Sequence, residues 1–143
     1  MFPSKTQIEA IIVELQKIMR LQDWDIKLSY LSAVEMYRDT GDISTIADCL
    51  RSRPHHLATI KMCYEADKTS NVVGNWYLTL VHEMFHILID EFDYATEFKV
   101  DHDDYSLPKE RLVCNLARMF VKLYPEKNFD SILNNQDNEC KTE

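Results

Sequence analysis

The stretch LTLVHEMFHILIDEF, residues 78–92, constrains the fold of this chain more than any other segment. It is almost wholly apolar until its acidic end, and an apolar run of this length is typical of a buried helix. Yet its middle carries His82, Glu83 and His86, which are costly to bury without strong partners. The sequence therefore predicts a helix over residues 72–91 whose apolar surroundings hold a group of three polar side chains.

The spacing of these three residues suits a metal ion. Four residues advance a helix by about 400°, so His82 and His86 project from one face, one turn apart, and their imidazoles can bind one cation at about 2.0–2.1 Å. Glu83 lies about 100° further round, where its carboxylate borders the ion and can accept a proton from a bound water. Two imidazoles plus a carboxylate favour Zn²⁺. The competing interpretation is a pair of core histidines beside a paired glutamate.

A third ligand must come from outside this helical turn. Asp90 continues the same helical row, but it lies about 12 Å along the axis from His82, so we expect it at the surface or beside the site. Glu110, 24 residues after His86, falls in the first turn of the next predicted helix, and antiparallel packing would bring it to the ion. His102, 16 residues after His86, is the alternative third ligand. An acid in a first turn can also serve the helix dipole alone, and a loop histidine can simply be exposed.

Changes in hydrophobic period predict the other elements. In the N-terminal segment apolar residues recur every three or four positions, as on one face of a helix, whereas WDIKLSYL alternates apolar and polar residues, as in a half-buried strand. The elements predicted in this way are a helix over 6–21, strands over 24–31, 43–51 and 57–65, and helices over 107–124 and 128–133.

Polar side chains mark the expected helix starts. Thr6 with Glu9 forms a capping box for the first helix, Asn71 caps the helix that holds the histidines, and Ser106 caps the last long helix. The segment SRPHH, between the second and third strands, suits a hairpin turn.

The order helix, strands, helix, helix indicates an α+β fold with a small antiparallel or mixed sheet. A chain of 143 residues fits one domain, which we place over residues 1–133. The tail NNQDNECKTE, residues 134–143, has too little apolar content to pack and is expected to be disordered.

Composition excludes several classes of protein. The net charge of -8 disfavours nucleic-acid binding, which depends on Lys and Arg neutralising phosphates. No apolar stretch reaches the roughly 18 residues of a membrane span, and the start MFPSK lacks the features of a signal peptide. The four cysteines are far apart, which suits reduced thiols in the cytoplasm, and Cys63 and Cys114 fall in apolar patterns typical of small core residues.

The segments HEMFH and KERLVCNLARMF together resemble the gluzincin metallopeptidases. The match looks most like small metallopeptidases encoded by phages and prophages, and more distantly like the ImmA/IrrE family. The resemblance implies a zincin-like domain with zinc bound by His82, His86 and Glu110, and with Glu83 as the general base. Cys114 and its neighbour depart from it, because small or acidic residues are expected there. A SprT-like arrangement would use His102 instead, but the glycine expected after that histidine is absent.

We therefore expect a zinc-dependent peptidase that acts on a peptide or protein in the cytoplasm, or in the host cytoplasm if the chain is phage-encoded. An exposed edge of the strand over 57–64 would bind the extended substrate. Two alternatives stay open: a metal-binding regulatory or interaction protein with little proteolytic activity, and a zinc hydrolase that acts on a non-peptide amide.

Overall fold

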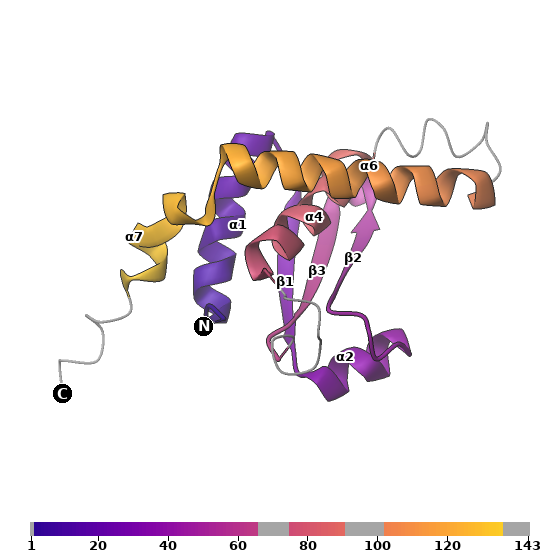
Figure 1. Ribbon diagram of the computed structural model, residues 1–143, viewed down its shortest axis with the longest axis horizontal. Helices are drawn as coiled ribbons and strands as arrows, with labels where there is room; N and C mark the ends of the chain where they lie inside the picture. Colours follow the sequence, from indigo (N-terminus) through magenta and orange to yellow (C-terminus); the bar gives the residue numbers. More distant parts are fainter. Residues whose placement is uncertain (1, 66–74, 91–101, 136–143) are drawn as a thin grey trace.

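The computed structural model describes residues 2–65, 75–90 and 102–135, with the backbone alone at 102–105. Figure 1 shows an α+β arrangement in which helices lie against a small sheet. The predicted fold class is therefore confirmed for the described residues. The helices are α1 (Lys5–Met19), α2 (Ala33–Thr40), α4 (Trp76–Leu88), α6 (His102–Leu123) and α7 (Asp130–Leu133), the strands are β1 (Asp25–Leu31), β2 (Ala47–Ser52) and β3 (Leu57–Cys63), and the 3-10 helices are η1 (Arg53–His55) and η2 (Glu126–Phe129).

The sheet is mixed, with the strand order β1-β3-β2. β1 runs parallel to β3, whereas β2 and β3 form the predicted antiparallel hairpin around η1. Because β3 is paired on both sides, it has no edge to offer an extended peptide. The prediction that residues 57–64 bind substrate by their edge is wrong, and among the described strands the free edges belong to β1 and β2.

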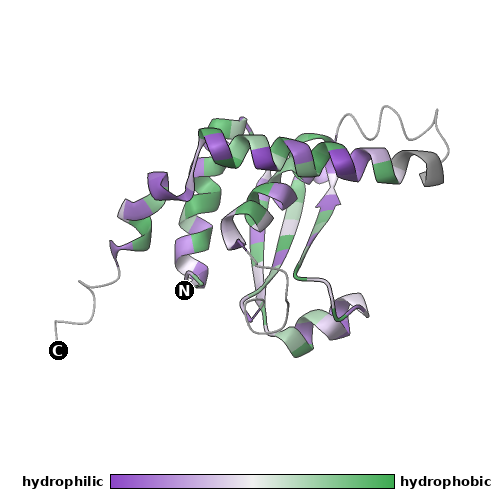
Figure 2. Ribbon diagram, in the orientation of Figure 1, coloured by the Kyte–Doolittle hydropathy of each residue, from purple (hydrophilic) through white to green (hydrophobic). Residues whose placement is uncertain are grey.

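One face of the sheet carries the core. On β3 the alternate residues Ala58, Ile60 and Met62 are buried, while Thr59 and Lys61 between them are only partly buried. α1 and α4 pack against the strands, and α6 packs against α4 (Figure 1). Figure 2 shows the consequence in hydropathy: α4 is largely apolar, whereas α6 alternates between apolar and polar residues. An α4 enclosed in this way is the buried helix that the sequence predicts.

The first helix begins earlier than predicted. Ser4 is its N-cap, and its hydroxyl accepts a hydrogen bond from the Gln7 backbone N–H while the Gln7 side chain accepts one from the Ser4 N–H. The capping box predicted at Thr6 and Glu9 is therefore wrong. Both pairs have the required spacing, but Thr6 already lies inside the helical turn that Ser4 starts.

Asn75 caps α4, since its side chain accepts hydrogen bonds from the backbone N–H groups of Tyr77 and Leu78. The predicted cap Asn71 lies outside the described residues. α6 begins at His102, so Ser106 lies inside the helix and the prediction that it forms the cap is wrong. The predicted helix began at residue 107 because the period of apolar residues starts there. The first turn of α6 carries no apolar pattern from which it could have been predicted.

The sequence prediction missed α2 entirely. Ser32 and Glu35 form a complete capping box, and Gly41 ends the helix with a φ of 71°, which suits glycine. The helix buries only Met36, so it shows almost no apolar period. The signal that would have found it is the S-x-x-E pattern followed by a glycine six residues later. The second strand is also shorter than predicted, since β2 starts at Ala47.

The C-terminal segment is anchored to α1. Phe129 is buried, and the Gln7 side-chain amide donates a hydrogen bond of 2.7 Å to the Leu133 carbonyl. The helix predicted over 128–133 is present in part, as η2 followed by α7. The tail predicted to be disordered lies outside the described residues from 136 onward.

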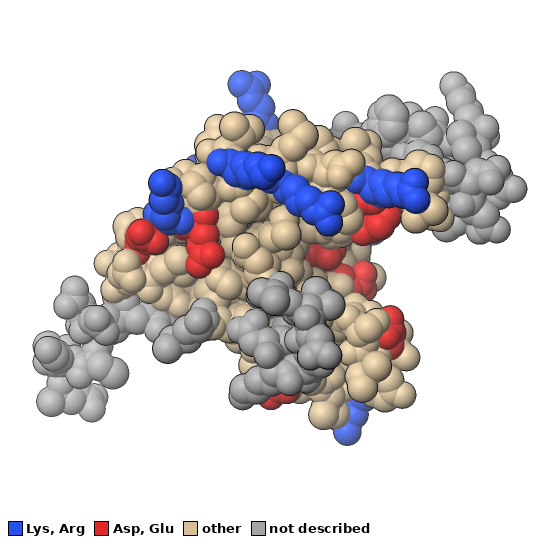
Figure 3. Space-filling model, viewed as in Figure 1, with Lys and Arg blue, Asp and Glu red and all other residues tan. Residues whose placement is uncertain are grey.

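Basic side chains gather along one helix on the face of the molecule drawn in Figure 3. Figure 3 shows Lys and Arg side chains along α6, although the whole chain is acidic. Among the described helices, none is long and apolar enough to cross a membrane.

Candidate metal centre

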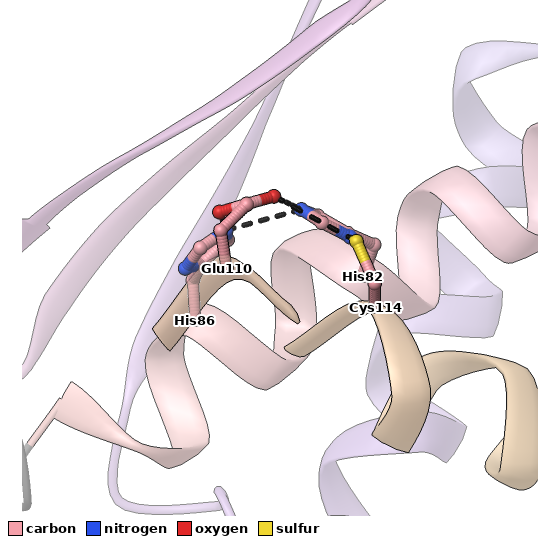
Figure 4. A network of polar contacts seen from close by, with 4 residues as sticks. All are labelled: His82, His86, Glu110 and Cys114. Carbon is pink, nitrogen blue, oxygen red and sulfur yellow. Dashed lines mark hydrogen bonds and ion pairs between the residues drawn. The ribbon is translucent and has the colours of Figure 1, made fainter. Parts of the chain in front are cut away.

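Two helices bring three ligand groups together. α4 contributes His82 and His86, and α6 contributes Glu110 (Figure 4). The Nε2 atoms of the two histidines lie 3.1 Å apart. Glu110 Oε1 is 3.0 Å from His82 Nε2, and Glu110 Oε2 is 3.5 Å from His86 Nε2. One side chain of α6 therefore faces both histidines of α4.

These distances fit one tetrahedral zinc ion. Ligand atoms at 2.0–2.1 Å from such an ion are separated from one another by about 3.3 Å. The closest approaches of the three side chains, at 3.0, 3.1 and 3.5 Å, lie around that value, with Oε1 of Glu110 nearest His82 and Oε2 nearest His86. His82 Nε2 also faces two acceptor groups at once, which a shared cation would satisfy better than a single proton. Among the described residues, His82, His86 and Glu110 thus form a group whose chemistry suits a metal.

The two helices run antiparallel, which is the packing that Glu110 needs in order to reach the histidines. The Tyr77 hydroxyl near the start of α4 donates a hydrogen bond of 2.6 Å to the Tyr124 carbonyl just after α6, while His86 near the end of α4 contacts Glu110. Val113 and Ala117 of α6 are buried against the core. Apolar packing therefore sets the crossing that places Glu110 at the histidines.

Burial keeps one of the histidines neutral. Burial of the imidazole, together with His82 beside it, lowers the pKa of His86 below its usual value. A neutral ring offers its nitrogen lone pair, so a metal would not have to displace a proton from His86 at neutral pH. Glu110 is more open, with 48 % of its side chain exposed. The group is thus closed on the histidine side and accessible on the glutamate side.

Glu83 lies beside this group but is buried, with 7 % of the residue exposed. Burial, together with the nearby carboxylates of Asp48 and Glu110, raises the pKa of Glu83 to about 8, while Arg51 acts in the opposite direction. A carboxyl group whose pKa is near neutral can both take up and return a proton. Its environment therefore differs from that of an ordinary surface acid.

Asp90 lies outside the group formed by His82, His86 and Glu110, which agrees with its predicted distance from the histidines. It does not lie at the surface either, because only 7 % of it is exposed. Its carboxylate pairs with Arg51 Nε at 3.1 Å and with Arg53 Nη2 at 3.0 Å. Arg53 also donates to the backbone carbonyl of Asp90. These contacts tie the end of α4 to β2 and η1.

Cys114 is the residue at this site that the sequence prediction missed. Cys63 is buried as predicted, but Cys114 is only partly buried. Its sulfur lies 3.8 Å from His82 Nδ1 and 3.9 Å from Glu110 Oε1 (Figure 4). Burial and the Glu110 carboxylate raise the pKa of the thiol. Its place four residues after Glu110, on the same helical row, was the available signal.

The side chain of His102 falls outside the described residues. The alternative in which it supplies the third ligand therefore stays a prediction. The backbone at this position belongs to the first turn of α6, not to the loop expected from the sequence.

Comparison of the chain with protein-family models, curated proteins and solved structures found no match.

Proposed function

We propose that this chain is a zinc-dependent peptidase of the gluzincin type, in which His82, His86 and Glu110 bind the ion and Glu83 is the general base. The supporting observation is the convergence of two imidazoles and one carboxylate from two antiparallel helices, with nearest ligand atoms 3.0 to 3.5 Å apart in each pair of side chains. Zinc bound there would polarise the scissile carbonyl and lower the pKa of a water towards about 7. The resemblance of the two motifs to phage and prophage metallopeptidases supports the same function.

Glu83 handles the proton in this proposal. Its carboxylate accepts a proton from the attacking water and then donates it to the leaving amine. Its burial excludes bulk water, which would otherwise compete for that proton. The pKa of about 8 is that of the side chain without a cation beside it, and positive charge near the carboxyl would lower it towards the working range of a base.

The free edge of β2 is the place where an extended substrate would bind. The Cys63 N–H donates to the Ile46 carbonyl, so these two residues form a hydrogen-bonded pair of the antiparallel ladder. With the observed register, the backbone groups of Ala47, Cys49 and Arg51 point away from β3. β2 also packs against α4, so a peptide added at this edge would run beside the metal helix.

A second function is favoured by one observation. The high pKa of Glu83 means that the isolated side chain is largely protonated at neutral pH and is then a poor base. If bound zinc does not lower the pKa of Glu83, the chain is a metal-binding regulatory or interaction protein with little proteolytic activity. Both functions use the same ligands, so zinc content alone does not separate them.

The test compares metal content and hydrolysis in matched variants. Zinc per chain is measured by elemental mass spectrometry, and cleavage is measured on a diverse peptide library by mass spectrometry. Glu83→Gln should keep one zinc per chain and lose hydrolysis, whereas His86→Ala should lose both. The exposed acid Glu9 provides the control, since Glu9→Gln should change neither.

Absence of zinc from the wild-type chain would refute the metal site. Cleavage that persists in Glu83→Gln would remove Glu83 as the base. Stoichiometric zinc without any cleavage by wild type, followed by capture of an intact protein partner, would favour the regulatory function.

A further inference from the structure

Cys114 contacts ligand groups from both helices of the proposed metal site. Its sulfur is 3.8 Å from Nδ1 of His82 on α4 and 3.9 Å from Oε1 of Glu110 on its own helix. Figure 4 shows the sulfur on the side of the His82 ring away from His86. Among the described residues, it is the side chain that links His82 Nδ1 to Glu110.

We propose that Cys114 is a positioning residue that orients two of the three metal ligands, an inference that rests on the proposed metal site. Its S–H donates to Glu110 Oε1. Because that is the only proton of the thiol, the sulfur can take part in the 3.8 Å contact with His82 Nδ1 only as an acceptor, which requires a proton on Nδ1. A proton held on Nδ1 leaves the Nε2 lone pair free for the ion. Cys114 therefore selects the ring tautomer that can bind metal.

The geometry excludes the sulfur itself from the ligand set. Cys114 faces Nδ1 of His82, whereas the converging atoms are the two Nε2 atoms and the Glu110 carboxylate. The contact lengths of 3.8 and 3.9 Å suit weak hydrogen bonds of a thiol. A neutral thiol also adds no second negative charge beside Glu110, as a carboxylate at this position would.

The other histidine provides an internal contrast. Nδ1 of His86 is buried and has no hydrogen-bond partner among the described residues. Among the described residues, packing alone therefore orients the Nδ1 side of the His86 ring, whereas the Nδ1 side of the His82 ring is also oriented by its contact with Cys114. Removing the thiol should consequently disturb one ligand ring and the carboxylate but leave the other ring in place.

The test measures zinc affinity by competition with a chelator for Cys114→Ala, Cys114→Ser and wild type. Cys114→Ala should weaken zinc binding about 10–100-fold, which is the usual effect of losing such a partner of a ligand. Cys114→Ser should lose less zinc affinity than Cys114→Ala, because a hydroxyl keeps a donor and an acceptor. It should still bind zinc more weakly than wild type, because the hydroxyl reaches less far than the thiol. The exposed neighbour on α6 is the control, and Asn115→Ala should bind zinc as wild type does.

Two further measurements separate positioning from a merely structural role. Side-chain nitrogen NMR of the metal-free protein should show His82 protonated mainly at Nδ1 in wild type and as a mixture of tautomers in Cys114→Ala. The thermal midpoint of the metal-free protein should be the same in both, because Cys114 is only partly buried.

Zinc affinity and tautomer populations that are unchanged in Cys114→Ala would overturn the inference while leaving the metal site intact. A sulfur-to-cobalt charge-transfer band in the cobalt-loaded wild type, lost in Cys114→Ala, would also overturn it by making the thiol a ligand. A wild-type chain that binds no zinc would refute the proposed function and this inference together.

Discussion

Glu83 and Asp90 are two carboxyl groups on the same segment of chain, and each is 7 % exposed. Asp90 lies between two guanidinium groups that neutralise it. Glu83 forms no ion pair among the described residues, and its pKa rises to about 8. Two equally buried acids thus differ in role. Asp90 forms a structural ion-pair cluster with Arg51 and Arg53, whereas Glu83 is a titratable group beside two histidines. The difference teaches that the partners of a buried acid, not its burial, indicate its role.

Removing Asp90 from its ion-pair cluster with Arg51 and Arg53 should have the largest effect on stability. Asp90→Ala leaves Arg51 and Arg53 without their shared carboxylate, and loss of one partner from a buried pair costs about 3–5 kcal/mol. The free energy of unfolding in urea measures this cost. Glu14→Ala is the control, because Glu14 pairs with Lys17 and both side chains are exposed, so its loss should cost at most about 1 kcal/mol. An equal loss in the free energy of unfolding for the two variants would show that the ion pairs of Asp90 do not stabilise the fold more than a surface pair does.

Adding zinc should stabilise the folded protein through the group of His82, His86 and Glu110. At a free concentration of 100 times its dissociation constant, a ligand of the folded state adds about 2.7 kcal/mol to the free energy of unfolding. Wild type and Asn115→Ala should gain this amount, and His86→Ala should gain none at the same zinc concentration. Calorimetry with and without a chelator measures the gain. A gain retained by His86→Ala would place the zinc elsewhere.

The pH dependence of the metal-free protein should show the smaller effect of Glu83. The folded pKa of about 8 exceeds the ordinary 4.5, so the contribution of Glu83 to stability is complete below pH 4.5 and is lost as pH rises to 8. We expect a loss of about 2 kcal/mol, because local rearrangement that admits water reduces the full pKa difference.

Glu83→Gln isolates this contribution. His86 has a lowered pKa and acts with the opposite sign, gaining stability as pH rises towards 6.5, and it is present in both proteins. The difference between wild type and Glu83→Gln should therefore grow in favour of the variant from pH 4.5 to 8. A difference independent of pH would show that Glu83 has an ordinary pKa.

Local patterns predicted the elements whose apolar faces meet the core. Most of the recurring apolar positions of α1 and β3 are buried, with Ile18 of α1 the exposed exception, because burial of one face imposes the period. In β1 only Leu28 is buried, and the alternating residues Ile26 and Tyr30 are partly buried. α2 was missed because it buries only Met36 and leaves almost no period to detect. The start of α6 was placed too late for the same reason.

The site divides in a similar way. His82, Glu83 and His86 could be grouped from the sequence because four residues nearly complete a helical turn. Glu110 could be proposed but not separated from His102, since the spacing along the chain does not fix how two helices cross. Cys114 was assigned to the core, because an apolar neighbourhood in sequence does not reveal which side chains lie across the helix interface.

The sequence by itself determined the histidine pair, the adjacent acid and the α+β class, because these depend on helical geometry and on the period of apolar residues. The tertiary structure alone decided that Glu110 and Cys114 of α6 face those histidines, which strand has a free edge beside α4, and how Asp90 is neutralised. These contacts join residues distant in sequence, and they depend on the packing of α4 against α6 and the sheet, which no local pattern specifies.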